Sequence, residues 1–238
     1  MNRIRLSIQK NSDLILHGLM CCVGGYMAGY AVLCRGNLGS AQTMNLIDLI
    51  FAVAGRNARE VLLRLAALLT YILGLSLVVI LSRRARVNIQ RYSILVDMAG
   101  FLVLAFIPEG ADRVAALLPL FFMLSTQWSV FHGVRGYNSA TVFSTNNLKQ
   151  AVVALNEYAL TKNRQHLGDA LYFLGTLFWF HASVVASYFT VRAFGPKSSL
   201  FAFIFALPAL AMTWVREEKT PVPASPGLKA GRAAGQSN

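Results

Sequence analysis

Two short polar runs, one in each half of the chain, share a pattern of side chains that could contact a polar or anionic group. The first run is Ser40–Asp48 and the second is Ser139–Gln150. Both contain Ser-Ala and then Thr-x-Asn-Leu-x-Asp/Gln. Hydroxyl and amide side chains donate and accept hydrogen bonds, so each run could bind a polar solute.

The two asparagines of these runs are predicted to begin helices. Asparagine is among the best N-cap residues, because its side-chain oxygen accepts a backbone N–H of the first turn. Asp48 and Gln150 follow Asn45 and Asn147 by three residues, which is the spacing of a capping box. The N-terminus of a helix carries a partial positive charge that attracts polar or anionic groups. We therefore expect both helix starts to contribute to a binding site.

The candidate site residues come from both runs and from one further apolar segment. They are predicted to line a substrate pathway: Gln42, Thr43, Asn45, Asp48, Gln127, Thr145, Asn146, Asn147 and Gln150. An alternative is that these groups only hold broken helices together, because irregular backbone at membrane depth must lie inside protein or along a cavity. For Gln127, hydrogen bonding between helices is an equally good explanation.

The composition places both runs in a membrane protein. Of the 238 residues, 55% are apolar and 13% are charged, whereas soluble domains carry about 25% charged residues. The mean hydropathy is +0.51. A spanning helix needs about 20 apolar residues. Six stretches reach or approach that length: Leu14–Cys34, Val61–Ser82, Tyr92–Ile107, Val114–Val134, Leu167–Val191 and Ser198–Val215.

Two further apolar stretches are too short to cross the bilayer comfortably. Leu46–Gly55 follows the first polar run and Leu148–Leu160 follows the second. The predicted fold is therefore an all-α, polytopic membrane helix bundle with six spanning helices and two short broken or re-entrant helices. If the short stretches crossed as well, the chain would have eight spans.

The distribution of lysine and arginine favours six spans over eight. Cytoplasmic loops of membrane proteins are enriched in these residues. With six spans and a cytoplasmic N-terminus, 15 basic residues lie inside and 6 outside, whereas eight spans give 12 and 8. The six-span arrangement predicts that both termini are cytoplasmic.

The halves of the chain are predicted to form two inverted repeats. Each half has one span before its polar run and two after it, and three spans per half require opposite orientations in the membrane. The predicted units are a cytoplasmic N-terminus (1–12), a first repeat (13–110), a second repeat (111–216) and a disordered, basic cytoplasmic tail (217–238). Thr43, Asn45, Thr145 and Asn147 are then expected to approach one another near the midplane, from opposite leaflets.

At these motifs the chain resembles the YoaK-type family of bacterial inner-membrane proteins, a domain of unknown function. The resemblance covers residues 12–215 and rests on Gly24–Ala31, Gly39–Leu46, Gln127–Trp128, Gly133, Gly136–Ser139 and Phe143–Leu148. It implies a bacterial cell (inner) membrane and about six spans, and it implies no established activity.

Other motifs are weighed against plain packing. Gly25-x-x-x-Gly29 lets another helix approach the first span, either within the bundle or in a homo-oligomer. Arg64, Asp97, Glu157 and Asp169 are interpreted as lying near the ends of predicted segments, where solvation at the interface is sufficient.

Other classes of function lack their sequence patterns. The net charge of +12 fits basic cytoplasmic loops better than nucleic-acid binding. Neither His-Glu-x-x-His, Gly-x-Ser-x-Gly nor a phosphate loop occurs, so no enzyme is predicted. The histidines and cysteines have no metal-ligand spacing, and no cofactor is predicted.

The leading hypothesis is a channel or secondary transporter for a small polar or anionic solute, whose partners are the lipid bilayer and that solute. The alternative is a non-transporting scaffold, assembly factor or sensor.

Overall fold

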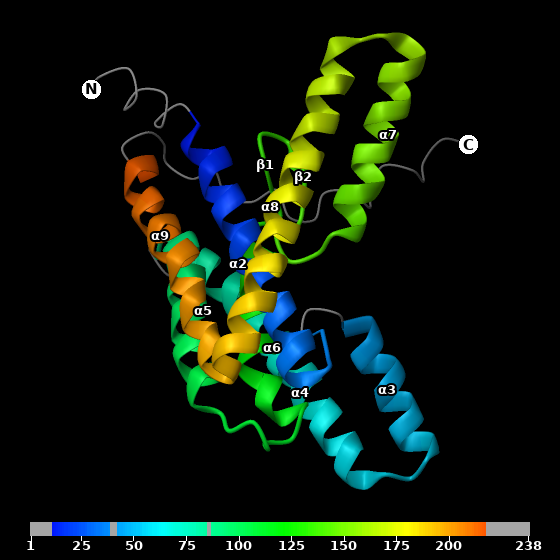
Figure 1. The fold of residues 1–238 in the computed structure, drawn as a ribbon, viewed down its shortest axis with the longest axis vertical. Coiled ribbons are helices and arrows are strands. Elements are labelled where there is room, and N and C mark those ends of the chain that lie inside the picture. The colour runs from blue at the N-terminus through cyan, green and yellow to red at the C-terminus, as the bar shows by residue number, and fades with distance from the viewer. Residues whose placement is uncertain (1–10, 39–41, 85–86, 218–238) are drawn as a thin grey trace.

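The computed structural model describes residues 11–38, 42–84 and 87–217, and almost all of them are helical (Figure 1). The elements are α2 (Ser12–Arg35), α3 (Gln42–Ala54), α4 (Ala58–Arg84), α5 (Ile89–Phe106), η1 (Ala115–Leu117), α6 (Leu118–Val130), β1 (Gly133–Val134), β2 (Tyr137–Asn138), α7 (Thr145–Thr161), α8 (Arg164–Phe194), η2 (Gly195–Ala202) and α9 (Phe203–Glu217). The tail 217–238, predicted to be disordered, lies outside the described residues from position 218 onward.

The predicted all-α membrane bundle is confirmed at this level. Among the described residues, four helical stretches are long and apolar enough to cross a membrane: Ser12–Arg35, Ala58–Arg84, Ile89–Phe106 and Arg164–Val215, the last of which runs through α8, η2 and α9. Two apolar helices are shorter, Gln42–Ala54 and Ala115–Val130. Large apolar side chains such as Leu62, Phe106 and Phe189 are exposed on the outside of the bundle, where lipid would cover them.

One predicted span is shorter in the structure than in the sequence analysis. The stretch Val114–Val134 was expected to be a single helix, but α6 ends at Val130. The chain then forms the two-stranded hairpin β1–β2, in which Gly133 pairs with Asn138. Gly133, Arg135 and Gly136 have positive φ angles, which a continuing helix does not allow.

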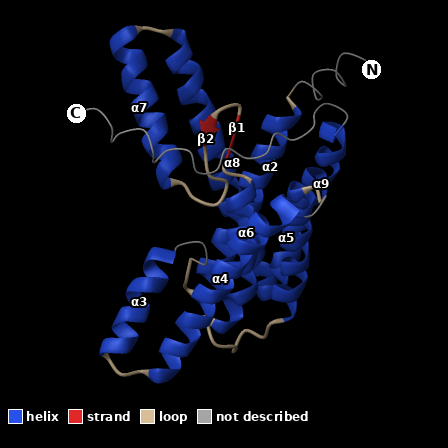
Figure 2. Cartoon of the chain, turned by 180° about the vertical axis from the view of Figure 1, so that it is seen from behind, coloured by secondary structure: helices blue, strands red, loops and turns tan. Residues whose placement is uncertain are grey.

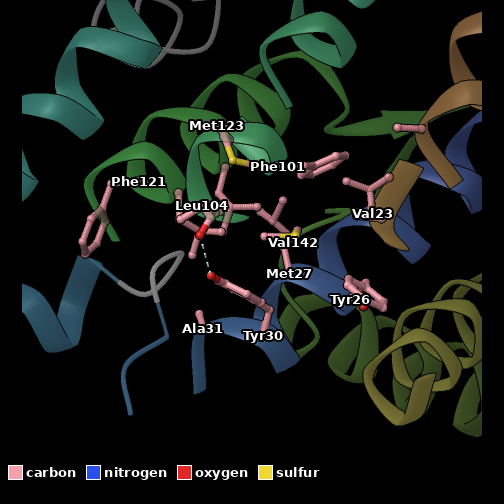
Figure 3. Packing of buried hydrophobic residues seen from close by; sticks show 14 of the residues in the cluster. Val23, Tyr26, Met27, Tyr30, Ala31, Phe101, Leu104, Phe121, Met123 and Val142 are labelled. Atoms are coloured by element: carbon pink, nitrogen blue, oxygen red, sulfur yellow. Dashed lines mark hydrogen bonds between the residues drawn. The ribbon is translucent and has the colours of Figure 1, made fainter. Parts of the chain in front are cut away.

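The first helix, α2, lies at the centre of the bundle and packs mainly against α8 and α9, while α6 packs mainly against α4 and α5. Its buried side chains contact those of several other helices. Tyr30 of α2, for example, donates its hydroxyl hydrogen to the Leu104 carbonyl oxygen of α5 at 3.3 Å (Figure 3). Gly25 and Gly29 lie directly against Ser183 and Ser187 of α8. The glycine face of α2 is therefore occupied by a helix of the same chain.

Two helical hairpins extend from this bundle toward opposite ends of the molecule. Helix α3 pairs with the first half of α4, and α7 pairs with the first half of α8 (Figures 1 and 2). In both views α3 and α7 begin at mid-height and run away from each other. The two short apolar segments thus become the outer arms of two hairpins, one at each end.

Candidate functional site

The first polar run forms the beginning of α3 and is tied to α4. Asn45 is 1% exposed. Its Nδ2 donates to Gln42 Oε1 at 3.2 Å and to the Arg64 carbonyl oxygen at 3.3 Å. Asn45 Oδ1 accepts a bond from Arg64 Nη1 at 3.5 Å. The asparagine therefore joins two helices through both ends of its amide.

Arg64 collects the charged groups around this helix start. Its Nη1 lies 2.9 Å from Asp48 Oδ2 and its Nε lies 2.8 Å from Glu60 Oε1. The Arg64 side chain is only 12% exposed, so these ion pairs are partly shielded from solvent. Arg64 lies near the start of α4, as expected, but it is not solvated at the interface, because its guanidinium contacts three partner side chains.

The prediction that Asn45 and Asn147 are helix caps is wrong. Helix α3 begins at Gln42 and α7 begins at Thr145, so both asparagines lie inside the first turn. The N-cap of α7 is Ser144, and its side chain makes no cap bond. The physical reason is that each amide is used to bind backbone from another segment, and Asp48 pairs with Arg64 instead of reaching back to a cap.

The second polar run holds a non-helical loop in place. Asn147 is 1% exposed, and its Nδ2 donates to the carbonyl oxygens of Ala140 at 2.8 Å and Phe143 at 3.2 Å. Asn146 Nδ2 donates to the Asn138 carbonyl oxygen at 3.0 Å. Thr145 is exposed at the helix start, and Gln150 is half-buried one turn later.

Gln127 belongs to this second cluster. It is fully buried on α6, and its Nε2 donates to the Met20 carbonyl oxygen at 2.8 Å and to Thr141 Oγ1 at 3.0 Å. Gln127 therefore joins α6, α2 and the loop that precedes α7. This contact agrees with the second explanation given for Gln127, hydrogen bonding between helices.

The structure brings the predicted residues together in two groups, one in each half. Gln42, Asn45 and Asp48 meet around Arg64, while Asn146 and Asn147 gather with Gln127 around residues 138–143. Thr43 is exposed beside the first group. Within the described residues, no hydrogen bond joins the two groups. Their approach near the midplane stays a prediction.

A pocket of about 460 Å³ opens beside the first group. Its lining combines the end of α2, the start of α3 and residues before η1, and it includes Arg35, Asn37, Met44, Asp48, Arg64 and Arg113. Three of these side chains are guanidinium groups and one is a carboxylate. Because Asp48 already pairs with Arg64, the remaining lining is positively charged.

Arg35 is the residue that the sequence analysis missed. It directly follows the predicted span Leu14–Cys34, so it counted among the six basic residues of the outside loops, but it is 2% exposed at the end of α2. Its Nη1 donates to the Glu109 carbonyl oxygen at 2.9 Å and its Nη2 to the Ile107 carbonyl oxygen at 3.2 Å, while Nε has no partner. Within the part of the chain that the structure describes, Arg35 forms no ion pair with a carboxylate.

Asp97 is a second residue that the sequence placed wrongly. It was expected near the end of a span, but it lies half-way along α5 and is fully buried. In the part of the chain that the structure describes, neither carboxyl oxygen has a hydrogen-bond partner. The third span begins at Ile89, three residues earlier than expected, and this extension moves Asp97 toward the middle of the helix.

Comparison with known proteins gives one result. The model of a family described as a protein of unknown function, DUF1275, matches residues 16–213. This is the family that the sequence motifs resemble. No curated protein and no solved structure matches the chain.

Proposed function

The chain belongs to the DUF1275 family, and from that premise we propose that it is a channel or secondary transporter for a small anionic solute in the bacterial cell membrane. The observation that carries the proposal is Arg35, a buried guanidinium that lines the pocket and forms no ion pair with a carboxylate of the described residues. The positive charge of Arg35 favours an anion over a neutral polar solute.

A buried charge without a counter-charge is costly. Moving an ion out of water costs several kcal/mol unless a paired charge and hydrogen bonds compensate. The two backbone carbonyls satisfy part of the Arg35 guanidinium but bring no negative charge. An anion in the pocket would supply it, and guanidinium groups bind carboxylate or phosphate oxygens through strong, charge-assisted bonds.

The size of the pocket fits a small solute. Ligand sites commonly enclose about 300–1,000 Å³, and this pocket encloses about 460 Å³. Arg113 is exposed at its rim, so it would meet an incoming anion before Arg35 does. Arg64 is already neutralised by Asp48 and Glu60, and it would hold the wall of the pocket rather than the solute.

The packing of the helices supports two inverted repeats. Gly25 of α2 lies against the Phe180 carbonyl and Ser183 of α8, and Gly74 of α4 lies against the Phe122 carbonyl and Ser125 of α6. Each of these crossings joins a glycine of the first half to a serine and a backbone carbonyl of the second half, so the two helix pairs that link the halves use the same kind of contact. Six spans with both termini cytoplasmic would place the pocket at the outer ends of α2 and α5.

A non-transporting scaffold, assembly factor or sensor is the second candidate. It is favoured by the burial of Asn45 and Asn147, whose amide groups bind backbone carbonyls of their own halves. In such a protein the two polar runs would be structural throughout. The distinction is therefore whether the pocket beside Arg35 takes up an anion that crosses the membrane.

The test measures solute uptake by the purified chain in phospholipid vesicles. The probes are radiolabelled phosphate, sulfate, acetate and succinate, with glycerol and urea as neutral solutes. We expect uptake of at least one anion, and Arg35→Gln and Arg113→Gln should weaken its apparent affinity about tenfold or more, because each removes a charged hydrogen-bond donor. Arg192→Gln is the matched control, since Arg192 is exposed and bonds to Tyr188 on its own helix.

Two outcomes overturn the proposal. One is that no anionic probe crosses at a rate above that of empty vesicles. The other is that both pocket variants transport with unchanged affinity. Arg113→Gln keeps the test valid if Arg35→Gln fails to fold, because Arg113 is exposed and holds no hydrogen bond to another described residue.

A further inference from the structure

We infer that Asp97 is a proton-binding site that couples proton movement to the passage of the anion. This inference rests on the proposed function for its coupling, while the binding of the proton stands on the structure of α5 alone. Asp97 is fully buried, and neither carboxyl oxygen has a hydrogen-bond partner among the described residues. Ionisable side chains inside a membrane are expensive and usually mark ion or proton pathways.

The position of Asp97 excludes solvation by snorkelling. Helix α5 runs from Ile89 to Phe106, and Asp97 is its ninth residue. An aspartate side chain is too short to reach water from the middle of a spanning helix. The side chain lies on the face of α5 that also buries Ile94, Phe101 and Leu104, which belong to the hydrophobic core.

The helices around α5 bring no counter-charge to Asp97. Helix α5 packs against α6, η2 and α9, and more lightly against α4. The sequence of α6 holds no ionisable residue, η2 holds only Lys197, and α9 holds only Arg216 and Glu217 at its end.

The ionisable residues of α4 are Tyr71 in its middle and Arg59, Glu60, Arg64, Arg83 and Arg84 near its ends. Among the described residues, none of them bonds to a carboxyl oxygen of Asp97. On α5 itself, Arg91 bonds to Thr213 and lies over the Trp214 ring. No ion pair involves Asp97 within the described residues. An ionised carboxylate here would be buried without a partner.

The resting form of Asp97 is therefore the neutral acid. The step is a simple protonation: a carboxylate oxygen takes one proton from hydronium, an O–H bond of hydronium breaks as the new O–H bond forms, water is released, and the charge of the side chain changes from −1 to 0. Release of the proton requires water to reach the side chain. A neutral Asp97 permits close packing of α5, and an ionised Asp97 favours a conformation that admits water, so each state of the site biases one arrangement of the bundle.

A buried hydroxyl marks the side from which a proton would arrive. Ser93 lies one turn before Asp97 on the same face of α5 and is fully buried, and its Oγ has no hydrogen-bond partner. One turn before Ser93, α5 begins at its N-cap Asn88, whose Oδ1 accepts bonds from the backbone N–H groups of Gln90 and Arg91. In the proposed topology this end of α5 is cytoplasmic, so the proton reaches Asp97 from that side.

The first experiment detects the proton directly. Infrared spectra of the full chain at pH 7, in a detergent that contains no ester groups, should contain the carbonyl stretch of a protonated carboxylic acid. Asp97→Asn should remove it, because the amide has the same shape and no acidic proton. Glu157→Gln is the matched control, since Glu157 is exposed on α7 and its variant should keep the band. A spectrum without the band, or a band that persists in Asp97→Asn, overturns the proton site.

The second experiment tests coupling with dihydrogen phosphate as the probe, because its neutral acid does not cross a lipid bilayer unaided as acetic acid does. One proton and one singly charged anion cross together without net charge, so a gradient of one pH unit should support about tenfold accumulation of this ion in wild type. Asp97→Asn should reduce this accumulation to none while still allowing exchange of phosphate. Equal accumulation by wild type and Asp97→Asn overturns coupling. If no probe enters any vesicle, the proposed function fails, and the infrared result alone decides the proton site.

Discussion

At the scale of single residues, the two asparagines of the polar runs act on the backbone. Asn45 and Asn147 are almost fully buried. Asn45 donates to the Arg64 carbonyl oxygen of α4, and Asn147 donates to carbonyl oxygens of the non-helical loop before α7. A buried carbonyl left without a donor costs about 1–3 kcal/mol. These amides therefore stabilise the places where the chain turns into the two hairpins.

Asn147→Ala is predicted to destabilise the protein by about 1–3 kcal/mol, because it leaves the Ala140 carbonyl without its donor in a buried site. Thermal unfolding of the purified chain in detergent, followed by circular dichroism, measures the loss. Asn156→Ala is the control, since the exposed Asn156 donates only to Val152 of its own helix. An equal unfolding temperature for both variants would contradict the structural role of Asn147.

At the scale of helices, two glycine contacts fix the crossing of the main pairs. A Cβ atom on Gly25 would overlap the Phe180 carbonyl oxygen, and one on Gly74 would overlap Ser125 Oγ. Small residues at such positions let membrane helices approach closely, and van der Waals packing then holds them. The close contact between these helices thus requires glycine, which has no Cβ atom, at both positions.

Gly25→Ala is predicted to destabilise the chain by about 1–3 kcal/mol or more, because backbone must move to make room for the methyl group. Gly175→Ala on α8 is the matched control: a Cβ there meets nothing within 4 Å, and alanine favours a helix by up to about 1 kcal/mol over glycine. Resistance to unfolding in a graded detergent series measures both. Two variants with the same small change would show that the α2–α8 crossing tolerates extra volume.

The helical segments could be predicted from the sequence because lipid imposes one strong rule. Apolar length alone located helices at α2, α4, α5 and α8, and the two short stretches proved to be α3 and α7. The partners of Asn45, Arg35 and Asp97 could not be predicted in this way. Their roles depend on which helices meet in space. The carbonyl groups of Arg64 and Glu109, which accept bonds from Asn45 and Arg35, are distant from them in sequence. The lack of a polar partner for Asp97 among the described residues leaves no local pattern in the sequence.

At the scale of the whole molecule, the two hairpins point to opposite ends of the bundle (Figure 1). The proposed topology assigns the α7–α8 turn to the cytoplasm and the η2 segment to the outside. This assignment follows the bias of basic residues toward cytoplasmic loops. Labelling from one side of intact cells can measure on which side of the membrane each of these segments lies.

A cysteine placed at Lys197 is predicted to react with a membrane-impermeant maleimide added outside intact spheroplasts, whereas one at Lys162 should react only after lysis. Both positions follow the ends of described helices, and Lys162 is exposed in the turn between α7 and α8. The background lacks Cys21, Cys22 and Cys34, which would otherwise contribute signal. Labelling of position 162 in intact spheroplasts would reverse the topology.

The central place of α2 bears on how the protein is made. In its most apolar window, 78% of residues are buried inside the protein, yet its chief partner, α8, emerges from the ribosome only after α7. At about 5–20 residues per second, synthesis leaves α2 in lipid for about ten seconds or longer before its glycine face and the Tyr26 hydroxyl find α8 and η2. Until α8 is made, insertion machinery or a membrane chaperone would have to cover the faces of α2 that α8 later contacts. Nascent chains stalled before α8 should therefore be preferred substrates of membrane proteases.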